Sequence, residues 1–172
     1  MMIQRLINTA TFLIVALPLC VSAATRHELI TQLDKIGIDI RTSESCGIKN
    51  QNNYATYHYS LNQICLSTTS SKDKALLDQS LTHESMHVVQ DCVAGIDNQY
   101  YIPLTAHYRR MNVDPAKIAR WRKAVLAELK RRGTIEHVRN VTMDSHHADV
   151  EAEAYAFENH PKDVVALLKA FC

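Results

Sequence analysis

The stretch SSKDKALLDQSLTHESMHVVQDCVAG, residues 70–95, decides the fold. Ser70 or Ser71 is a suitable N-cap, and the closing glycine is a natural stop because glycine adopts the left-handed conformation that often ends a helix. Apolar residues recur between these ends with helical spacing. The stretch therefore predicts one long helix that runs to Cys92 or Val93. Its apolar positions are Ala75, Leu77, Leu81, Val88 and Val89.

The middle of this helix carries the motif HESMHVVQ. His83 and His87 are four residues apart, so they share a helix face and can offer two imidazoles to one ion. Glu84 lies beside them, where its carboxylate can reach a water on the metal without being a ligand. Zinc lowers the pKa of such a water towards about 7, and a glutamate can take its proton as it attacks a carbonyl. The motif predicts His83 and His87 as metal ligands and Glu84 as the general base.

A catalytic zinc site needs a third protein ligand and one open position. The longer motif HExxHxxGxxH would supply a histidine, but Val93 stands at that position and Gln90 stands at the glycine position. This version is excluded. The alternative is a glutamate on a later helix, and the segment EAEAYAFE, residues 151–158, offers it.

HESMHVVQ followed by EAEAYAF resembles the glutamate-ligand zincins, or gluzincins, in which HExxH precedes a helix bearing ExxA or ExEA. The resemblance implies a zinc metallopeptidase with one Zn²⁺ ion. In families with the ExEAD form, the first glutamate is the ligand and the acid four residues later supports a zinc-bound histidine. Carried onto this chain, the ligand is Glu151. Tyr155 takes the place of the acid, a departure that leaves the support of the histidine unassigned.

Two alternatives to Glu151 as third ligand remain open. Glu153 also fits ExxA, and helix geometry places the two glutamates about 200° apart, so only one can face the metal. Glu151 shares its face with His147 and Tyr155, which favours Glu151, while His147 is itself a candidate ligand. The Glu153 face carries His146, Asp149 and Phe157. Candidates to donate to a developing oxyanion are Tyr155, Tyr100, Tyr101 and His107.

The first two dozen residues, MMIQRLINTATFLIVALPLCVSAA, are typical of a secretory signal peptide. Arg5 precedes an apolar run that is shorter than the about 20 residues of a membrane span, and small residues offer cleavage after Ala23 or Ala24. The sequence predicts a signal peptide at 1–23 and a single zincin-like metallohydrolase domain at 24–172. The protein is expected to be secreted or periplasmic.

Four cysteines remain after signal removal, an even number that predicts two disulfides in an oxidising compartment. We favour Cys46 with Cys65, because they flank a segment that resembles a hairpin, which leaves Cys92 with Cys172. The absence of any CxxC pair in the sequence argues against a cysteine-ligated zinc site. The 18 basic and 18 acidic residues of the mature chain balance, and nothing points to nucleic acid.

A basic helix is predicted after residue 113, with Asp114 as N-cap, Pro115 at its first position and Gly133 at its end. The simplest interpretation of its charged face is a solvated surface. The alternative is a weak contact of the helix at 115–132 with anionic lipid or cell-wall polymer. The basic residues are Lys117, Arg120, Arg122, Lys123, Lys130, Arg131 and Arg132.

The remaining pattern predicts an α+β fold, a mainly helical zincin-like domain with a small antiparallel sheet before the active-site helix. A helix is expected at Thr25–Ile36, strands within NYATYHYSL and QICLST, and two C-terminal helices divided by Pro161. The stretch GIDNQYYIPLTAHYRRMNV is expected to be a long connection.

Two classes of function follow from these patterns. The first is an exported zinc metallopeptidase with no stable membrane span, which binds a peptide or protein substrate and aligns it on the tyrosine-rich strand at 53–61. The second is a non-catalytic zinc-binding or structural cell-envelope protein. A metallohydrolase acting on cell-wall material differs from the first only in substrate. The first class needs Glu84 free beside an open metal position, whereas the second would enclose the metal or lack it.

Overall fold

The structure is a computed structural model that describes residues 23–44, 46, 54–68, 72–95, 100–142 and 145–172. Most of the predicted signal peptide and the predicted caps Ser70 and Ser71 lie outside these ranges. The elements are α2 (Ala23–Lys35), β1 (Asp39–Ser43), β2 (Ala55–His58), the 3-10 turn η2 (Tyr59–Leu61), β3 (Gln63–Ser67), α4 (Lys74–Ala94), α5 (Leu104–Arg110), α6 (Pro115–Arg132), α7 (Ile135–Val141), α8 (Ser145–Phe157) and α9 (Pro161–Phe171).

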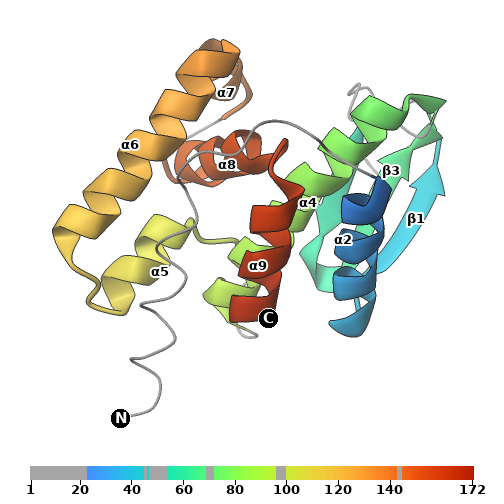
Figure 1. Ribbon diagram of the computed structural model, residues 1–172, viewed down its shortest axis with the longest axis horizontal. Coiled ribbons are helices and arrows are strands. Elements are labelled where there is room, and N and C mark those ends of the chain that lie inside the picture. The colour runs from blue at the N-terminus through green and yellow to red at the C-terminus, as the bar shows by residue number, and fades with distance from the viewer. Residues whose placement is uncertain (1–22, 45, 47–53, 69–71, 96–99, 143–144) are drawn as a thin grey trace.

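Helix α4 is the centre of the fold, and the predicted α+β class with mainly helical content is confirmed. Figure 1 shows the sheet and α2 on one side of α4 and the elements α5 to α8 on the other. Helices α8 and α9 pack directly on α4, and strands β2 and β3 contact it from the sheet side. The HESMHVVQ motif on α4 therefore lies where the two parts of the molecule meet.

The ends of α4 follow from side-chain chemistry. Asp73 is the N-cap, and its carboxylate accepts hydrogen bonds from the backbone N–H groups of Ala75 and Leu76. At the other end the chain leaves the helix at Gly95 with a φ of 93°, which a side-chain-bearing residue rarely adopts. The observed helix thus begins at Lys74, capped by Asp73 and not by Ser70 or Ser71 as predicted, and it reaches Ala94, past the predicted end at Cys92 or Val93.

The sheet has three strands in the order β1-β3-β2. Strand β2 pairs antiparallel with β3, as predicted, but β1 pairs with β3 in parallel, so the prediction of an antiparallel sheet is wrong for that strand. Burial explains only the strand order: four of the five residues of β3 are buried, and this strand takes the central place between two more exposed neighbours. Strand β2 is consequently an edge strand.

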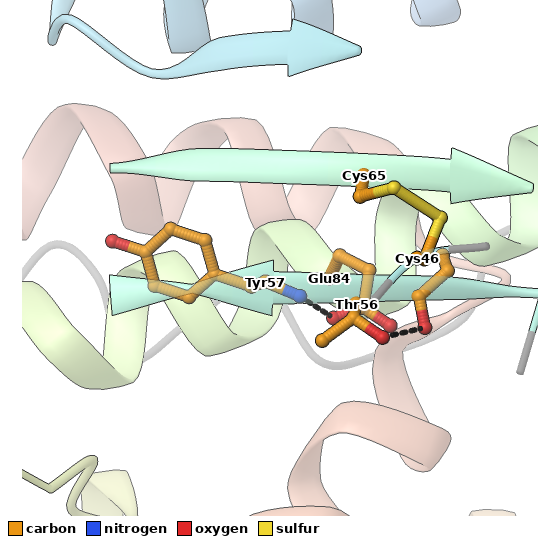
Figure 2. The surroundings of a disulfide bond; sticks show 6 residues. Cys46, Thr56, Tyr57, Cys65 and Glu84 are labelled. Carbon is orange, nitrogen blue, oxygen red and sulfur yellow. Dashed lines mark hydrogen bonds between the residues drawn. A yellow bond between two sulfur atoms is a disulfide. The ribbon is translucent and has the colours of Figure 1, made fainter. Parts of the chain in front are cut away.

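Two disulfides join the cysteine pairs that the sequence favoured. Cys46 is bonded to Cys65 on β3 (Figure 2), and Cys92 near the end of α4 is bonded to Cys172. Such bonds indicate an oxidising, extracellular type of environment. Among the described residues, no helix combines the length and the apolar character that a membrane crossing requires.

Helix α6 matches its predicted bounds, with Asp114 at its N-cap and Gly133 at its end. Three of its basic residues form ion pairs, of which those of Arg122 and Arg131 lie at the exposed surface and only that of Arg132 is largely buried. The pairs are Arg122 with Asp149, Arg131 with Glu128, and Arg132 with Glu158. The suggested contact of this helix with an anionic surface stays a prediction.

The expected long connection after α4 is wrong in part, because it contains the short helix α5. Its N-cap, Pro103, makes no side-chain cap bond, and the first N–H groups of α5, at Leu104 and Thr105, donate instead to the carboxylate of Glu153 on α8. This helix depends on a tertiary contact, which local sequence does not reveal.

Candidate metal centre

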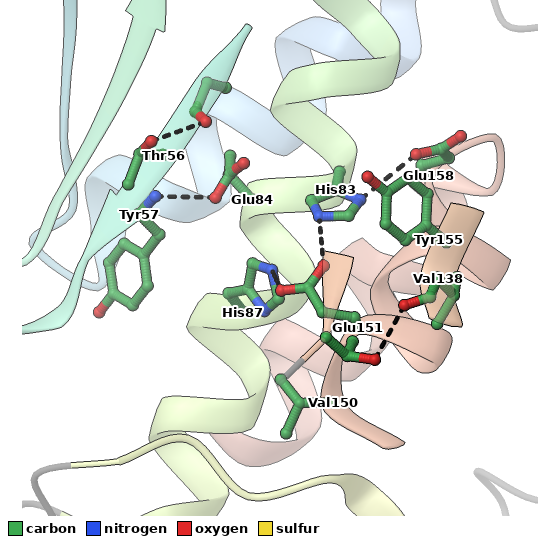
Figure 3. Close-up of polar contacts among 12 residues, drawn as sticks. Thr56, Tyr57, His83, Glu84, His87, Val138, Val150, Glu151, Tyr155 and Glu158 are labelled. Carbon is green, nitrogen blue, oxygen red and sulfur yellow. Dashed lines mark hydrogen bonds and ion pairs between the residues drawn. The ribbon is translucent and has the colours of Figure 1, made fainter. Parts of the chain in front are cut away.

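Two elements bring three ligand-type side chains together. His83 and His87 project from successive turns of α4, and Glu151 projects from α8 (Figure 3). The Nε2 atom of His83 lies 3.5 Å from one carboxylate oxygen of Glu151, and the Nε2 atom of His87 lies 3.4 Å from the other. One ligand atom of each residue lies within 4.8 Å of the others, so the group can hold a metal ion.

The spacing and the orientation of these donors both suit a metal ion. Ligands that bind zinc at about 2.0 to 2.2 Å lie roughly 3 to 4 Å apart, which matches the observed separations. Each histidine engages its second ring nitrogen elsewhere: Nδ1 of His83 contacts Glu158 Oε2 at 3.3 Å, and Nδ1 of His87 contacts Gln90 Oε1 at 2.8 Å. Both Nε2 atoms therefore face Glu151, in the arrangement typical of supported metal-binding histidines.

The ionisation of the cluster follows from its burial and its close charges. Burial favours the neutral form of His83, but hydrogen bonds to Glu151 and Glu158 and the charge of Glu84 outweigh it and raise the pKa of His83 above its ordinary value of 6.5. Burial by itself would raise the pKa of Glu151, yet His87 and His83 lower it well below 4.5. Without metal, the cluster thus holds a proton on His83 beside an ionised Glu151.

Metal binding is expected to displace the proton of His83, because an imidazole nitrogen must be unprotonated to bind a metal ion. The raised pKa keeps this proton bound at neutral pH, so the apparent affinity for Zn²⁺ should rise about tenfold per pH unit above pH 6.5. Titration calorimetry in two buffers with different protonation enthalpies measures the released proton. An affinity that stays flat between about pH 6.5 and 8 would contradict this charge state.

Sequence reasoning missed the acid that supports His83. Glu158, one residue past the end of α8, contacts His83 Nδ1 and also accepts a hydrogen bond from Gln79 Nε2 at 2.5 Å. Arg132 completes its surroundings with an ion pair. The available signal was its position seven residues after Glu151, because two helical turns return a side chain to the same face.

Tyr155, at the position of the acid in the ExEAD pattern, packs against the metal centre instead of bonding to it. Its ring contacts that of His83 edge to face at a centroid distance of 4.5 Å, and its hydroxyl lies 2.7 Å from His137 Nε2. On the opposite side, the ring of Tyr101 stacks on His87 at 5.2 Å. Of the other oxyanion candidates, Tyr100 is 74% exposed, and His107 packs against Phe171.

Glu153, the rival ligand, lies outside the cluster and is only 2% exposed. Burial raises its pKa to about 7, against the effect of its N–H donors. These donors are the backbone of Leu104 and Thr105, Gln90 Nε2 and Trp121 Nε1. His147 lies nearer the centre, with Nε2 3.8 Å from Glu151, but its side chain is 47% exposed.

Replacing Glu153 with glutamine is expected to lower the free energy of unfolding by about 1 to 3 kcal/mol. The amide would turn its own N–H groups towards donors that the carboxylate now satisfies, and an unsatisfied buried donor costs about that much. Urea unfolding of the oxidised, metal-free protein measures the change. Glu136→Gln, at a side chain that is 74% exposed, is the matched control and should stay within about 0.5 kcal/mol of wild type.

Glu84 lies on the side of the histidine pair that faces β2 (Figure 3). It is 7% exposed, and its Oε2 accepts a hydrogen bond of 2.7 Å from the backbone N–H of Tyr57. The carbonyl of Tyr57 accepts a bond of 2.9 Å from the hydroxyl of Tyr101. The backbone groups of Tyr57 are thus occupied by the protein itself, at the edge strand that the sequence assigned to peptide alignment.

Comparison with known protein families gives a match over most of the chain. Residues 41–172 match the family described as Domain of unknown function (DUF8637), and this range contains His83, His87 and Glu151 of the candidate metal centre. No curated protein and no solved structure matches the chain. The chain belongs to the family Domain of unknown function (DUF8637).

Proposed function

We propose that this protein is an exported zinc-dependent hydrolase that cleaves peptide bonds. The observation that carries the proposal is the convergence of three donors, the Nε2 atoms of His83 and His87 and the carboxylate of Glu151, at distances that suit one ion. Two imidazoles and a carboxylate are a common ligand set of catalytic zinc, which leaves a fourth position for water or substrate. The two disulfides and the signal-like N-terminal sequence support export.

The proposed chemistry divides the work between ligands and base. A bound zinc ion supplies a Lewis acid that polarises the substrate carbonyl and lowers the pKa of a water. His83, His87 and Glu151 hold the ion, while Glu158 and Gln90 fix the two imidazole rings. Glu84 takes the proton of the attacking water and delivers it to the departing amine. The bond from Tyr57 occupies Oε2 of Glu84 and can orient its carboxylate for this role.

A second candidate is a non-catalytic metal-binding protein, and the same bond favours it. A carboxylate that is 7% exposed and held by a strand amide can also be a structural anchor between α4 and β2. The two candidates share the metal ligands and differ in whether Glu84 acts on water. Turnover therefore separates them, whereas metal content does not.

The test of the proposed function is the metal content of the purified protein together with its activity on a mixed peptide library. Wild type should carry about one zinc per chain and cut peptides, and His87→Ala should lose both properties. His27→Ala, at an exposed histidine of α2, is the matched control and should retain them. Absence of zinc from wild type would reject the metal centre. Zinc without cleavage of any peptide in the library would favour the non-catalytic candidate.

A further inference from the structure

The amide of Gln90 has a forced orientation beneath the metal centre. Gln90 is fully buried on α4, and its Nε2 donates to the carbonyl of Val150 at 2.9 Å and to Glu153 Oε2 at 3.2 Å. The Val150 carbonyl can only accept a hydrogen bond, so the amide nitrogen must face it. The amide oxygen then has to face His87, whose Nδ1 lies 2.8 Å away.

This orientation determines where His87 carries its hydrogen. An amide oxygen can only accept, so Nδ1 of His87 must be the donor, and in the neutral ring Nε2 is then the atom whose lone pair is available to a metal ion. A glutamine with the opposite orientation would require hydrogen on Nε2, which would block metal binding. The sequence offered no signal for this role, because Gln90 stands at the position where the longer zinc motif has glycine.

Glu153 holds the glutamine in place from the other side. Its carboxylate accepts from two backbone N–H groups at the start of α5 and from the indole of Trp121 on α6, in addition to Gln90. When Glu153 is ionised, its oxygen beside Gln90 is an acceptor, and it receives the N–H side of the amide. Helices α5 and α6 are thus linked to His87 by a chain of hydrogen bonds through the buried side chains of Glu153 and Gln90.

We propose that Gln90 is a positioning residue that keeps hydrogen on Nδ1 of His87 and thereby presents Nε2 to the metal, with Glu153 fixing the amide. The inference rests on the proposed function for its purpose, but its central statement concerns the metal-free protein. It gives the second glutamate of EAEAYAF a task that differs from metal ligation.

The experiment observes the side-chain Nδ1–H of His87 by ¹⁵N-edited NMR of the metal-free protein, with His87→Ala used to assign the signal. Wild type should show a slowly exchanging Nδ1–H, and Gln90→Met, which keeps the length but has no amide oxygen, should lose it. Gln79→Met on the same helix is the matched control and should keep the His87 signal, because Gln79 bonds to Glu158 instead. The Zn²⁺ affinity of Gln90→Met should fall about 10- to 100-fold in competition with a chelator.

A charge-conserving exchange tests the pair itself. Gln90→Glu combined with Glu153→Gln should keep the His87 Nδ1–H signal at least in part, because the new carboxylate can accept from His87, whereas the Val150 carbonyl loses its side-chain donor. A wild-type His87 with hydrogen on Nε2 alone would overturn the inference, and this measurement does not depend on any variant. A Gln90→Met variant with an unchanged His87 signal and unchanged Zn²⁺ affinity would overturn it as well. Failure of wild type to bind zinc would reject the proposed function and leave the NMR result to decide the role of Gln90.

Discussion

Glu151→Gln is expected to lower the affinity for Zn²⁺ by at least about 100-fold, more than the about 10- to 100-fold typical of losing a residue that only supports a ligand. The substitution replaces an anionic oxygen donor, placed 3.4 to 3.5 Å from both histidine nitrogens, with a neutral amide of the same shape. Glutamate and glutamine differ little in helix propensity, so α8 should persist. Competition with a chelator of known affinity measures the change.

Two further substitutions make this result specific. Glu158→Gln should cause a smaller loss, because Glu158 acts on the metal only through His83. His147→Ala, which removes an exposed histidine 3.8 Å from Glu151, should leave affinity near that of wild type. If Glu151→Gln kept the wild-type affinity for Zn²⁺, or if His147→Ala lost more affinity than Glu151→Gln, the third metal ligand would be a side chain other than Glu151.

Glu84→Gln is expected to retain zinc and to reduce kcat by roughly 100-fold or more, the usual contribution of a general base. The amide oxygen can still accept the hydrogen bond from Tyr57, so the contact between α4 and β2 is preserved while the basic group is lost. Zinc content, the free energy of unfolding and hydrolysis of a peptide that wild type cleaves are measured on the same preparation.

The result with Glu84→Gln shows whether Glu84 is a general base or only a structural contact between α4 and β2. Unchanged turnover in Glu84→Gln would remove Glu84 from the reaction, and loss of zinc would mean that Glu84 helps to hold the metal. Glu84→Ala removes both the carboxylate and the bond to Tyr57, so it should also lower stability, by about 1 to 3 kcal/mol for the buried amide left without a partner.

Features that depend only on the spacing of nearby residues could be predicted from the sequence. The four-residue interval between His83 and His87, the apolar period of α4 and the framing of α6 by Asp114 and Gly133 each depend on neighbours within one or two helical turns. The choice of Glu151 over Glu153 came from the resemblance to the ExEAD pattern, supported by the neighbours of each glutamate on its helix face, and the structure places Glu151 beside the histidines and Glu153 outside the cluster.

Features that depend on distant partners could not be predicted in this way. The parallel pairing of β1 with β3 is a choice between sheet edges, and strand composition carries little information about direction. Helix α5 requires the carboxylate of Glu153, which lies 49 residues from Leu104 in the sequence. The support of His83 by Glu158 spans 75 residues and joins α4 to the residue that follows α8.

The Cys92–Cys172 disulfide shortens the path between the metal ligands in the unfolded chain. Along the backbone, 64 residues separate His87 from Glu151, but through the disulfide the path covers only the 5 residues to Cys92 and the 21 residues back from Cys172. Loop-closure entropy grows with the logarithm of this length, so oxidation should make it about 0.8 kcal/mol easier for a metal ion to gather the third ligand before the rest of the chain folds. Under the proposed function, a chain that meets a metal ion while still reduced would therefore bring its three ligands together at a higher entropic cost than an oxidised chain.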